Sequence, residues 1–300
     1  FGYLILAIGM ILTLFNKNSR FRKLVKASGK MREKRKKMFA VVVFGLLVSS
    51  VSGQTGTNIL PLNKEHVKEF EELLIQSRKG RIEPTVTLAS EIMRKVAKEN
   101  SWEDMSPTEV FLDMQANPEI WKNVAIIKVA NSELREFLGI NGKYASFNNI
   151  VTPRNQGGYK LSSMVNAAYE KSANERNKLD KEVMNVDERV NILNSVFTGH
   201  FFNVFPVPGH PNQKWVSVHE AENMGEEGAE FARQIVGNYW QSVARRDWGS
   251  ANQLLAQIKA YQHQEGAQII PSDSKVKLEI LYHKADVFGK LSKIFMTVGL

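Results

Sequence analysis

The stretch KLSSMVNAAYEKSANERNKLDKEVMNVDERVNILNSVFTGHFF (160–202) decides the fold class, because it contains no proline and only one glycine. Apolar side chains recur along it three or four residues apart, as they do on the buried face of an amphipathic helix. They are Leu161, Met164, Val165, Ala168, Leu179, Val183, Val186, Val190, Leu193 and Val196. The pattern predicts two long helices with a break near 172–174.

Helical patterns also lie on both sides of this stretch. The sequence SPTE (106–109) places a capping serine, a proline and an acidic residue in the order that starts a helix, and NP (117–118) is a second start. A helix is expected from Asn63 toward Gly80, and two more over 230–266. The chain therefore has a mainly α fold class.

Strand signals are few. The run VAIIKV (124–129) is short and apolar, and 202–207 could pair with 215–218 across the Pro-Gly turn at 208–209. We therefore expect a minor β element within an otherwise helical domain over 54–285.

The apolar ends of the chain predict membrane segments. Residues 1–15 and 38–53 carry no charge, and the chain turns apolar again over 286–300. The expected fold class is thus a membrane helical hairpin (1–53), a helical extracytoplasmic domain (54–285) and the start of a further transmembrane helix (286–300). The first apolar segment is short for a span, so we expect a fragment of a longer protein. Two alternatives stay open: a cleaved signal peptide at 38–53 and an interfacial helix at 286–300.

The positive charge of the chain is concentrated in one segment. Residues 16–37 hold eleven Lys and Arg against one glutamate, whereas the whole chain has a formal net charge of +9. A nucleic-acid-binding domain would spread its basic residues over a folded face, so nucleic acid is disfavoured as a partner. The positive-inside rule assigns the basic loop 16–37 to the cytoplasm and the residues after 53 to the other side.

Several kinds of chemistry have no support in the sequence. With no cysteine, the chain can form no disulfide, thiolate nucleophile or Cys-ligated metal site, and it cannot itself carry a haem-attachment motif. Neither a His-Glu-x-x-His metal motif nor a Gly-x-Ser-x-Gly elbow occurs. We predict no catalytic residue and no metal ligand. The mixed charges over 180–189 predict a solvated, self-paired helix face.

Three of the six histidines are candidate contacts. His200, His210 and His219 lie close together in the sequence, beside several aromatic residues. A haem edge could rest on such a surface. The alternative, that they are solvated turn residues, stays open.

The stretch GRIEPTVTLAS (80–90) is the second candidate. Gly80 is expected to end a helix, Pro84 to stiffen the link, and Thr87 to cap the next helix. Arg81 could clamp a carboxylate or a propionate in a bidentate contact. The alternative, which the sequence favours, is that Arg81 ties down a loop between two helices.

Several segments together resemble a known family. They are GMILTLFNKNSRFRKL (9–24), GRIEPTVTLASEIMRKV (80–96), WKNVAIIKV (121–129) and NERNKLDKEVMNVDERVNIL (174–193), followed by VFPVP. Together they resemble the fused ResB/CcsA-type proteins of System II cytochrome c biogenesis. The resemblance implies a haem exporter and haem lyase that attaches haem to apocytochrome c. It also implies a place in the bacterial inner membrane, with 54–285 as the periplasmic domain between the two halves.

The sequence departs from that family where haem is handled. None of its five tryptophans lies in a Trp-rich cluster, so we assign no haem ligand and expect no tightly bound haem. The roles of Gly80, Arg81, Pro84 and Thr87 are not settled by the resemblance. A different function stays open: a membrane-anchored extracytoplasmic binding or scaffold domain without catalysis.

Overall fold

The structure, a computed structural model, describes residues 59–285 except 154 and 156, together with 291 and 295. These residues all belong to one compact unit, Thr57–Leu300. The segments predicted as membrane hairpin and basic loop (1–53) lie outside the described residues, as does most of 286–300.

The membrane helical hairpin of the predicted fold class is corrected. No helix within the described residues is long and apolar enough to cross a membrane. The long helices are amphipathic: α10 (Lys178–Phe197), for example, alternates buried valines with charged and amide side chains. The fold class is a mainly helical domain with small sheets.

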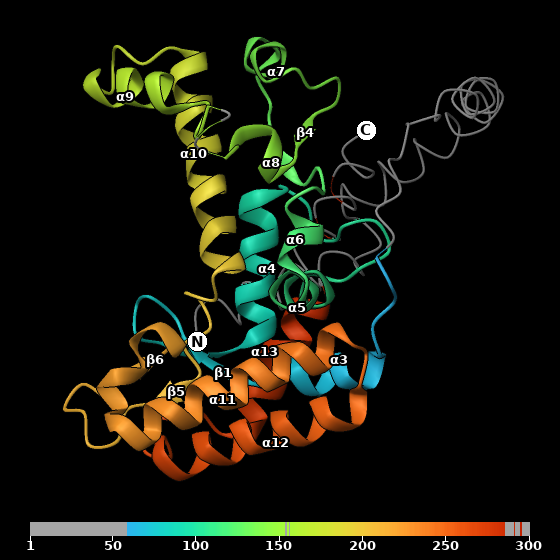
Figure 1. Cartoon of the computed structure of the whole chain (residues 1–300), viewed down its shortest axis with the longest axis vertical. Helices are drawn as coiled ribbons and strands as arrows, with labels where there is room; N and C mark the ends of the chain where they lie inside the picture. Colours follow the sequence, from blue (N-terminus) through green and yellow to red (C-terminus); the bar gives the residue numbers. More distant parts are fainter. Residues whose placement is uncertain (1–58, 154, 156, 286–290, 292–294, 296–300) are drawn as a thin grey trace, which may run out of the picture. The chain divides into compact units, whose positions relative to one another are not determined.

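Helices make up most of the described domain (Figure 1). Besides α10 they are α3 (Lys64–Glu71), α4 (Thr85–Val96), α5 (Pro107–Ala116), α6 (Pro118–Trp121), α7 (Ser132–Leu138), α8 (Phe147–Ile150), α9 (Ser162–Glu170), the 3-10 helix η2 (Val218–Met224), α11 (Gly225–Ala244), α12 (Trp248–Glu265) and α13 (Asp273–Ala285). The predicted pair of helices around 172–174 is confirmed as α9 and α10. The start predicted at 106–109 is also confirmed, because Ser106 and Glu109 form a capping box.

The strands form three antiparallel pairs. They are β1 (Leu74–Gln76) with β2 (Ile82–Pro84), β3 (Ile127–Lys128) with β4 (Tyr144–Ala145), and β5 (Phe205–Pro206) with β6 (Trp215–Val216). The hairpin predicted across 208–209 is confirmed, with Phe205 opposite Val216. The minor β element is therefore present.

The helix expected from Asn63 toward Gly80 is wrong in its second half. Helix α3 ends at Glu71, and the chain continues as strand β1. A short apolar run such as 73–75 is compatible with either helix or strand. Pairing with β2, and a bond from the Gln76 N–H to the Asn203 carbonyl (3.0 Å), decide for the strand.

The solvated face predicted over 180–189 is also wrong in part. Asp180, Glu182 and Arg189 are buried. Glu182 Oε1 accepts from Arg189 (3.1 Å) and from the Ala130 N–H (2.7 Å), and Arg189 also donates to the Lys128 carbonyl. This face packs against β3, whose buried backbone groups need partners, so the charges are used inside the fold.

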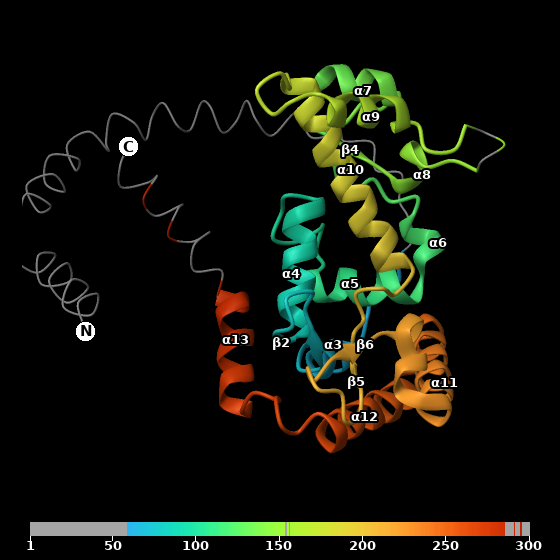
Figure 2. The same cartoon turned by 90° about the vertical axis from the view of Figure 1, so that its left-hand side faces the viewer.

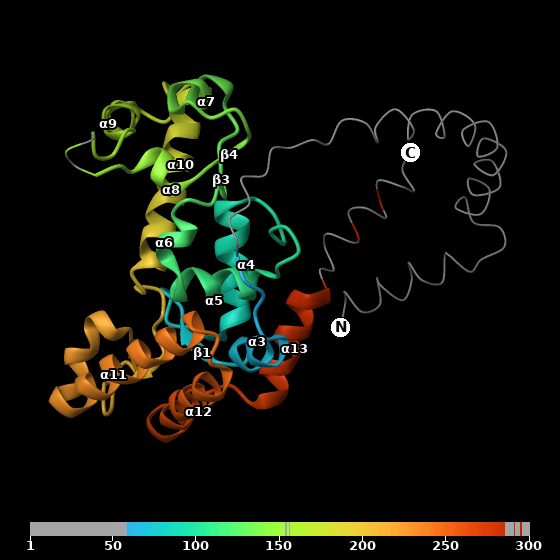
Figure 3. The same cartoon turned by 45° about the vertical axis from the view of Figure 1, so that its right-hand side comes forward.

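One hydrophobic core joins the elements. Phe70 of α3 lies near its middle, with ring centroids 6.2–6.3 Å from those of Phe111, Phe202 and Tyr239. Helix α10 packs against α4 and α5, and α11 packs against α12 (Figure 2). Helix α13 contacts α4 and β2, and Figure 3 shows it beside α4. These contacts fix the surfaces on which the candidate residues lie.

Candidate functional site

The structure brings two of the three predicted histidines together. The rings of His200 and His219 stack with their centroids 4.1 Å apart and their planes 6° apart. His200 follows the C-terminal end of α10 and His219 lies in η2, so two separate elements build the pair. Both side chains are exposed and therefore accessible to a partner.

Thr198, the C-cap of α10, holds both rings. Its hydroxyl lies 2.7 Å from His200 Nδ1, and its carbonyl accepts a hydrogen bond from His219 Nε2. A carbonyl can only accept, so His219 carries a proton on Nε2. Gly199, with φ +77°, allows the turn that brings His200 back beside Thr198. In the part of the chain that the structure describes, His200 Nε2 and His219 Nδ1 have no hydrogen-bond partner.

Phe201, the residue that follows His200 in the sequence, has a cation above its ring. The Arg78 guanidinium lies 4.7 Å from the centroid of the Phe201 ring. Arg78 comes from the exposed turn between β1 and β2 and was not predicted, because only the tertiary fold places it beside Phe201. We call Arg78, His200, Phe201 and His219 the histidine-pair surface. It offers two imidazoles, a ring face and a positive charge to a partner.

His210 is not part of this surface. It lies in the turn between β5 and β6, where its Nδ1 accepts a bond from the Asn212 N–H (3.2 Å). It lines a small cavity of about 80 Å³ together with Trp215. Among the described residues, no ring contact joins His210 to His200 or His219. The sequence cluster of three is thus split into a pair and a separate turn residue.

The most deeply buried histidine is His66, which the sequence did not single out. Its Nδ1 lies 2.6 Å from Asn252 Oδ1, and its Nε2 lies 2.9 Å from the Tyr239 hydroxyl. Burial lowers the pKa of His66, although the bond to Asn252 acts in the opposite direction. With both nitrogens engaged, His66 joins α3, α11 and α12 and has no free position for a ligand.

The 80–90 stretch is a strand-to-helix element rather than a link between two helices. Gly80 lies in the turn between β1 and β2 with φ +80°, and Pro84 ends β2 in an extended conformation. Because α4 already begins at Thr85, the prediction that Thr87 caps it is wrong. The Thr87 hydroxyl instead donates to Glu279 Oε1 of α13 (2.7 Å).

Arg81 contacts two carboxylates of the same chain. Its guanidinium forms a hydrogen-bonded ion pair with Glu279 and a longer one with Glu83 (3.5 Å). Together with Thr87, Arg81 therefore joins the β2–α4 element to α13. A carboxylate ligand at Arg81 would have to displace one of these partners.

Glu83 is the most perturbed carboxyl of this junction. It is 4% exposed. Burial raises its pKa to about 7, with a further contribution from the negative charge of Glu91, while Arg81 acts in the opposite direction. Glu83 therefore gains and loses its proton near neutral pH, and the charge of the junction changes with it.

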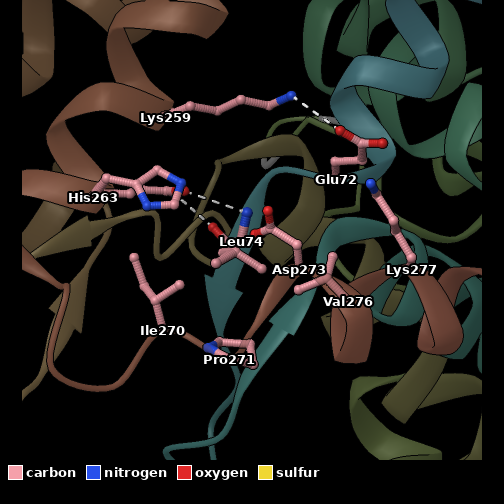
Figure 4. Close-up of a pocket in the computed structure, with 10 residues that line it drawn as sticks. Glu72, Leu74, Lys259, His263, Ile270, Pro271, Asp273, Val276 and Lys277 are labelled. Carbon is pink, nitrogen blue, oxygen red and sulfur yellow. Dashed lines mark hydrogen bonds and ion pairs between the residues drawn. The ribbon is translucent and has the colours of Figure 1, made fainter.

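A cavity of about 260 Å³ lies between α12 and the start of α13, beside β1. Figure 4 shows the side chains of Lys259 and Lys277 extending toward Glu72. Lys259 is paired with Glu69 (2.7 Å) and Glu72 (3.8 Å), and Gln262 bonds to the Leu74 backbone. Three of the polar side chains that line this cavity, Glu72, Lys259 and Gln262, are thus engaged within the chain.

The stacked imidazoles of His200 and His219 do not form a bis-His haem site. Two axial imidazoles must lie on opposite faces of the macrocycle. Rings stacked 4.1 Å apart leave no space for a porphyrin between them. Within the residues that the structure describes, no group of three or more His, Cys, Asp or Glu could hold a metal ion.

Comparison with known proteins gives one informative similarity. No known protein-family profile matches the chain. The chain is 31% identical over 308 aligned positions to Protein NrfI from Wolinella succinogenes. The alignment covers 99% of this chain and 34% of NrfI, so the chain spans about a third of the length of that relative. The chain is therefore similar to one part of NrfI, and this similarity does not select the ResB/CcsA type.

Proposed function

We propose that this chain takes part in attaching haem to cytochrome c, as one part of a longer biogenesis protein. The observation that carries the proposal is the similarity over 99% of the chain to NrfI, a cytochrome c biogenesis protein. Haem and apocytochrome c are then the substrates. Because the chain spans only about a third of NrfI, the activity of the whole protein is part of what we propose.

In this proposal the described domain is the external domain between the two halves of a fused haem exporter and synthase. It would face the extracytoplasmic side of the bacterial inner membrane and receive apocytochrome c there. The lack of any cysteine supports a receiving role, because every thiol that bonds to haem must then come from the partner. The ligation step itself takes place in another part of the protein.

The histidine-pair surface is the proposed contact for the substrates. The Phe201 ring and the stacked imidazoles offer flat faces to a porphyrin edge, and Arg78 offers a charge partner for a propionate. His200 and His219 each keep one nitrogen free for a hydrogen bond. Such a contact is one-sided and weak, as a transfer step requires.

A scaffold role without haem contact is the alternative. It is favoured by the junction of Arg81, Glu83, Thr87 and Glu279, whose polar groups bind one another rather than a ligand. In that case the histidine-pair surface would have no part in the reaction.

The test is cytochrome c maturation in a bacterium whose own maturation genes are deleted. The protein that carries this chain is produced together with an apocytochrome c, and covalent haem is detected by peroxidase staining after denaturing electrophoresis. We expect stained cytochrome c with the wild type and a several-fold lower yield with the double variant His200→Ala/His219→Ala. His210→Ala is the matched control and should give a normal yield.

The outcomes separate the two functions. Absence of covalent haem with well-expressed wild-type protein would contradict a role in haem attachment. Normal staining by the double variant would favour the scaffold role.

A further inference from the structure

A second cavity lies against the last turn of α13, between that helix, α4 and the N-terminal end of α5. Its volume is about 390 Å³, within the range of small-molecule sites. The side chains that matter to its chemistry are Ser90, Arg94, Thr108, His283, Lys284 and Glu71. It differs from the cavity of Figure 4, which the first turns of α13 line.

One buried donor of this cavity lacks an acceptor. The Thr108 side chain is 0% exposed, and its hydroxyl has no hydrogen-bond partner within the described residues. Buried hydroxyls are normally paired, because leaving one unpaired costs free energy. A bound acceptor in the cavity would recover that cost.

The start of helix α5 adds positive potential at the same place. Thr108 is the second residue of this ten-residue helix, so its N–H precedes the first intrahelical bond, from the Val110 N–H to the Ser106 carbonyl. Unpaired N–H groups in the first turn of a helix attract anions. The Glu109 carboxylate accepts a hydrogen bond from the N–H of Ser106 (2.7 Å), and Glu109 itself does not line the cavity.

The charges that line the cavity are not balanced. Lys284 is paired with Glu71 (2.5 Å), whereas Arg94 has no ion pair with any carboxylate in the part that the structure describes. Burial lowers the pKa of His283, and the Arg94 charge lowers it further, so near neutral pH this ring is uncharged and offers one N–H. The uncompensated charge of the cavity is therefore the Arg94 cation.

We propose that this cavity binds an oxyanion, the carboxylate or phosphate group of a small ligand. Arg94 is the charge partner, and the Thr108 hydroxyl and N–H are the hydrogen-bond donors. The Ser90 hydroxyl, which makes no hydrogen bond within the described residues, can act as a further donor. The oxyanion can come from a haem propionate or from a free small anion. The site is inferred from the cavity alone and does not depend on the proposed function.

The experiment is isothermal titration calorimetry of the purified chain with inorganic phosphate and with succinate, at constant ionic strength. We expect the wild type to bind at least one of these anions. The affinity should fall at least tenfold in Thr108→Val and in Arg94→Gln. The matched control Arg245→Gln removes an exposed arginine that does not line the cavity and should leave binding unchanged.

Thermal unfolding separates lost binding from lost folding. Thr108→Val removes an unpaired hydroxyl without changing the volume much, so its melting temperature should equal or exceed that of the wild type. Thr85→Val is the matched comparison, because the Thr85 hydroxyl donates to the Phe70 carbonyl, and it should melt lower. No anion binding by the wild type, or wild-type binding by both cavity variants, would overturn the proposal.

Competition then identifies the source of the oxyanion. Displacement of bound phosphate or succinate by haem, but not by haem dimethyl ester, would support a propionate as the ligand group. Failure of both porphyrins to displace it would support a free small anion.

Discussion

His66 and the His200–His219 pair put the same side chain in opposite surroundings. His66 is buried, and both of its nitrogens are engaged by Asn252 and Tyr239. His200 and His219 are exposed, and each uses one nitrogen on Thr198 and keeps the other free. The difference teaches how to tell the two kinds of histidine apart. A histidine with both ring nitrogens hydrogen-bonded is structural, whereas one with a free ring nitrogen can bind a partner.

The largest effect is expected at the buried member of this comparison. His66→Leu leaves the buried Tyr239 hydroxyl without its partner, so the free energy of unfolding should fall by about 3 kcal/mol. Urea denaturation measures this loss. The exposed His263→Leu is the control and should change the free energy of unfolding by less than about 0.5 kcal/mol. Equal losses of unfolding free energy in both variants would show that the buried histidine is no more important to stability than an exposed one.

The second effect is a pH dependence that does not arise from any histidine. The pKa of Glu83 is about 7 in the folded chain against an ordinary value of 4.5, so the folded chain binds this proton more tightly than the unfolded chain. Stability from Glu83 is therefore complete below about pH 4.5 and is lost as pH rises toward 7. Glu83→Gln should be more stable than the wild type at pH 8 by about 2 kcal/mol.

Denaturation at pH 4.5 and pH 8 checks this sign. The gain of the variant should almost vanish at the lower pH, where Glu83 is protonated in the folded chain and half protonated in the unfolded chain. A variant less stable than the wild type at pH 8 would show that Glu83 is held there as a useful carboxylate.

A smaller effect is expected at Thr87, because its acceptor Glu279 also has a second partner. Thr87→Val removes one hydrogen bond to Glu279, which keeps its ion pair with Arg81. The free energy of unfolding should fall by about 1 kcal/mol. The same denaturation series checks it. A loss as large as that of His66→Leu would mean that the junction with α13 is as important to the fold as the buried histidine.

The smallest effect on stability is expected at the histidine-pair surface. His200→Ala/His219→Ala removes exposed rings, so the free energy of unfolding should change by less than about 0.5 kcal/mol. Its effect should appear in haem and apocytochrome c contact instead. A large loss of stability would place this pair with His66 among the structural residues.

Local patterns were enough to predict much of the fold. The capping box at Ser106 and the apolar stripe of α10 are encoded in neighbouring residues, and both occur in the structure. Strand β1 was missed because its apolar run fits a helix equally well, and pairing with β2 decides between them. The prediction that Thr87 caps a helix failed because α4 already starts at Thr85, two residues before Thr87.

The candidate site was less predictable, because it depends on contacts between distant segments. The sequence grouped His200, His210 and His219, and only the return of η2 to the end of α10 shows which two meet. Arg78 contacts Phe201, the neighbour of His200 in the sequence, from a turn more than a hundred residues earlier in the chain. Burial of Glu182 and Arg189 likewise depends on β3, which no helical charge pattern reveals.

The central claim is that this domain receives its substrates and has no haem-ligation site of its own. A haem titration of the purified chain, followed by absorbance, tests this claim most directly. The wild type should bind haem weakly and without a sharp six-coordinate spectrum, and His200→Ala/His219→Ala should weaken that binding further while His210→Ala leaves it unchanged. Stoichiometric binding with a sharp six-coordinate spectrum, lost in the double variant, would contradict the account and place the haem ligands in this domain.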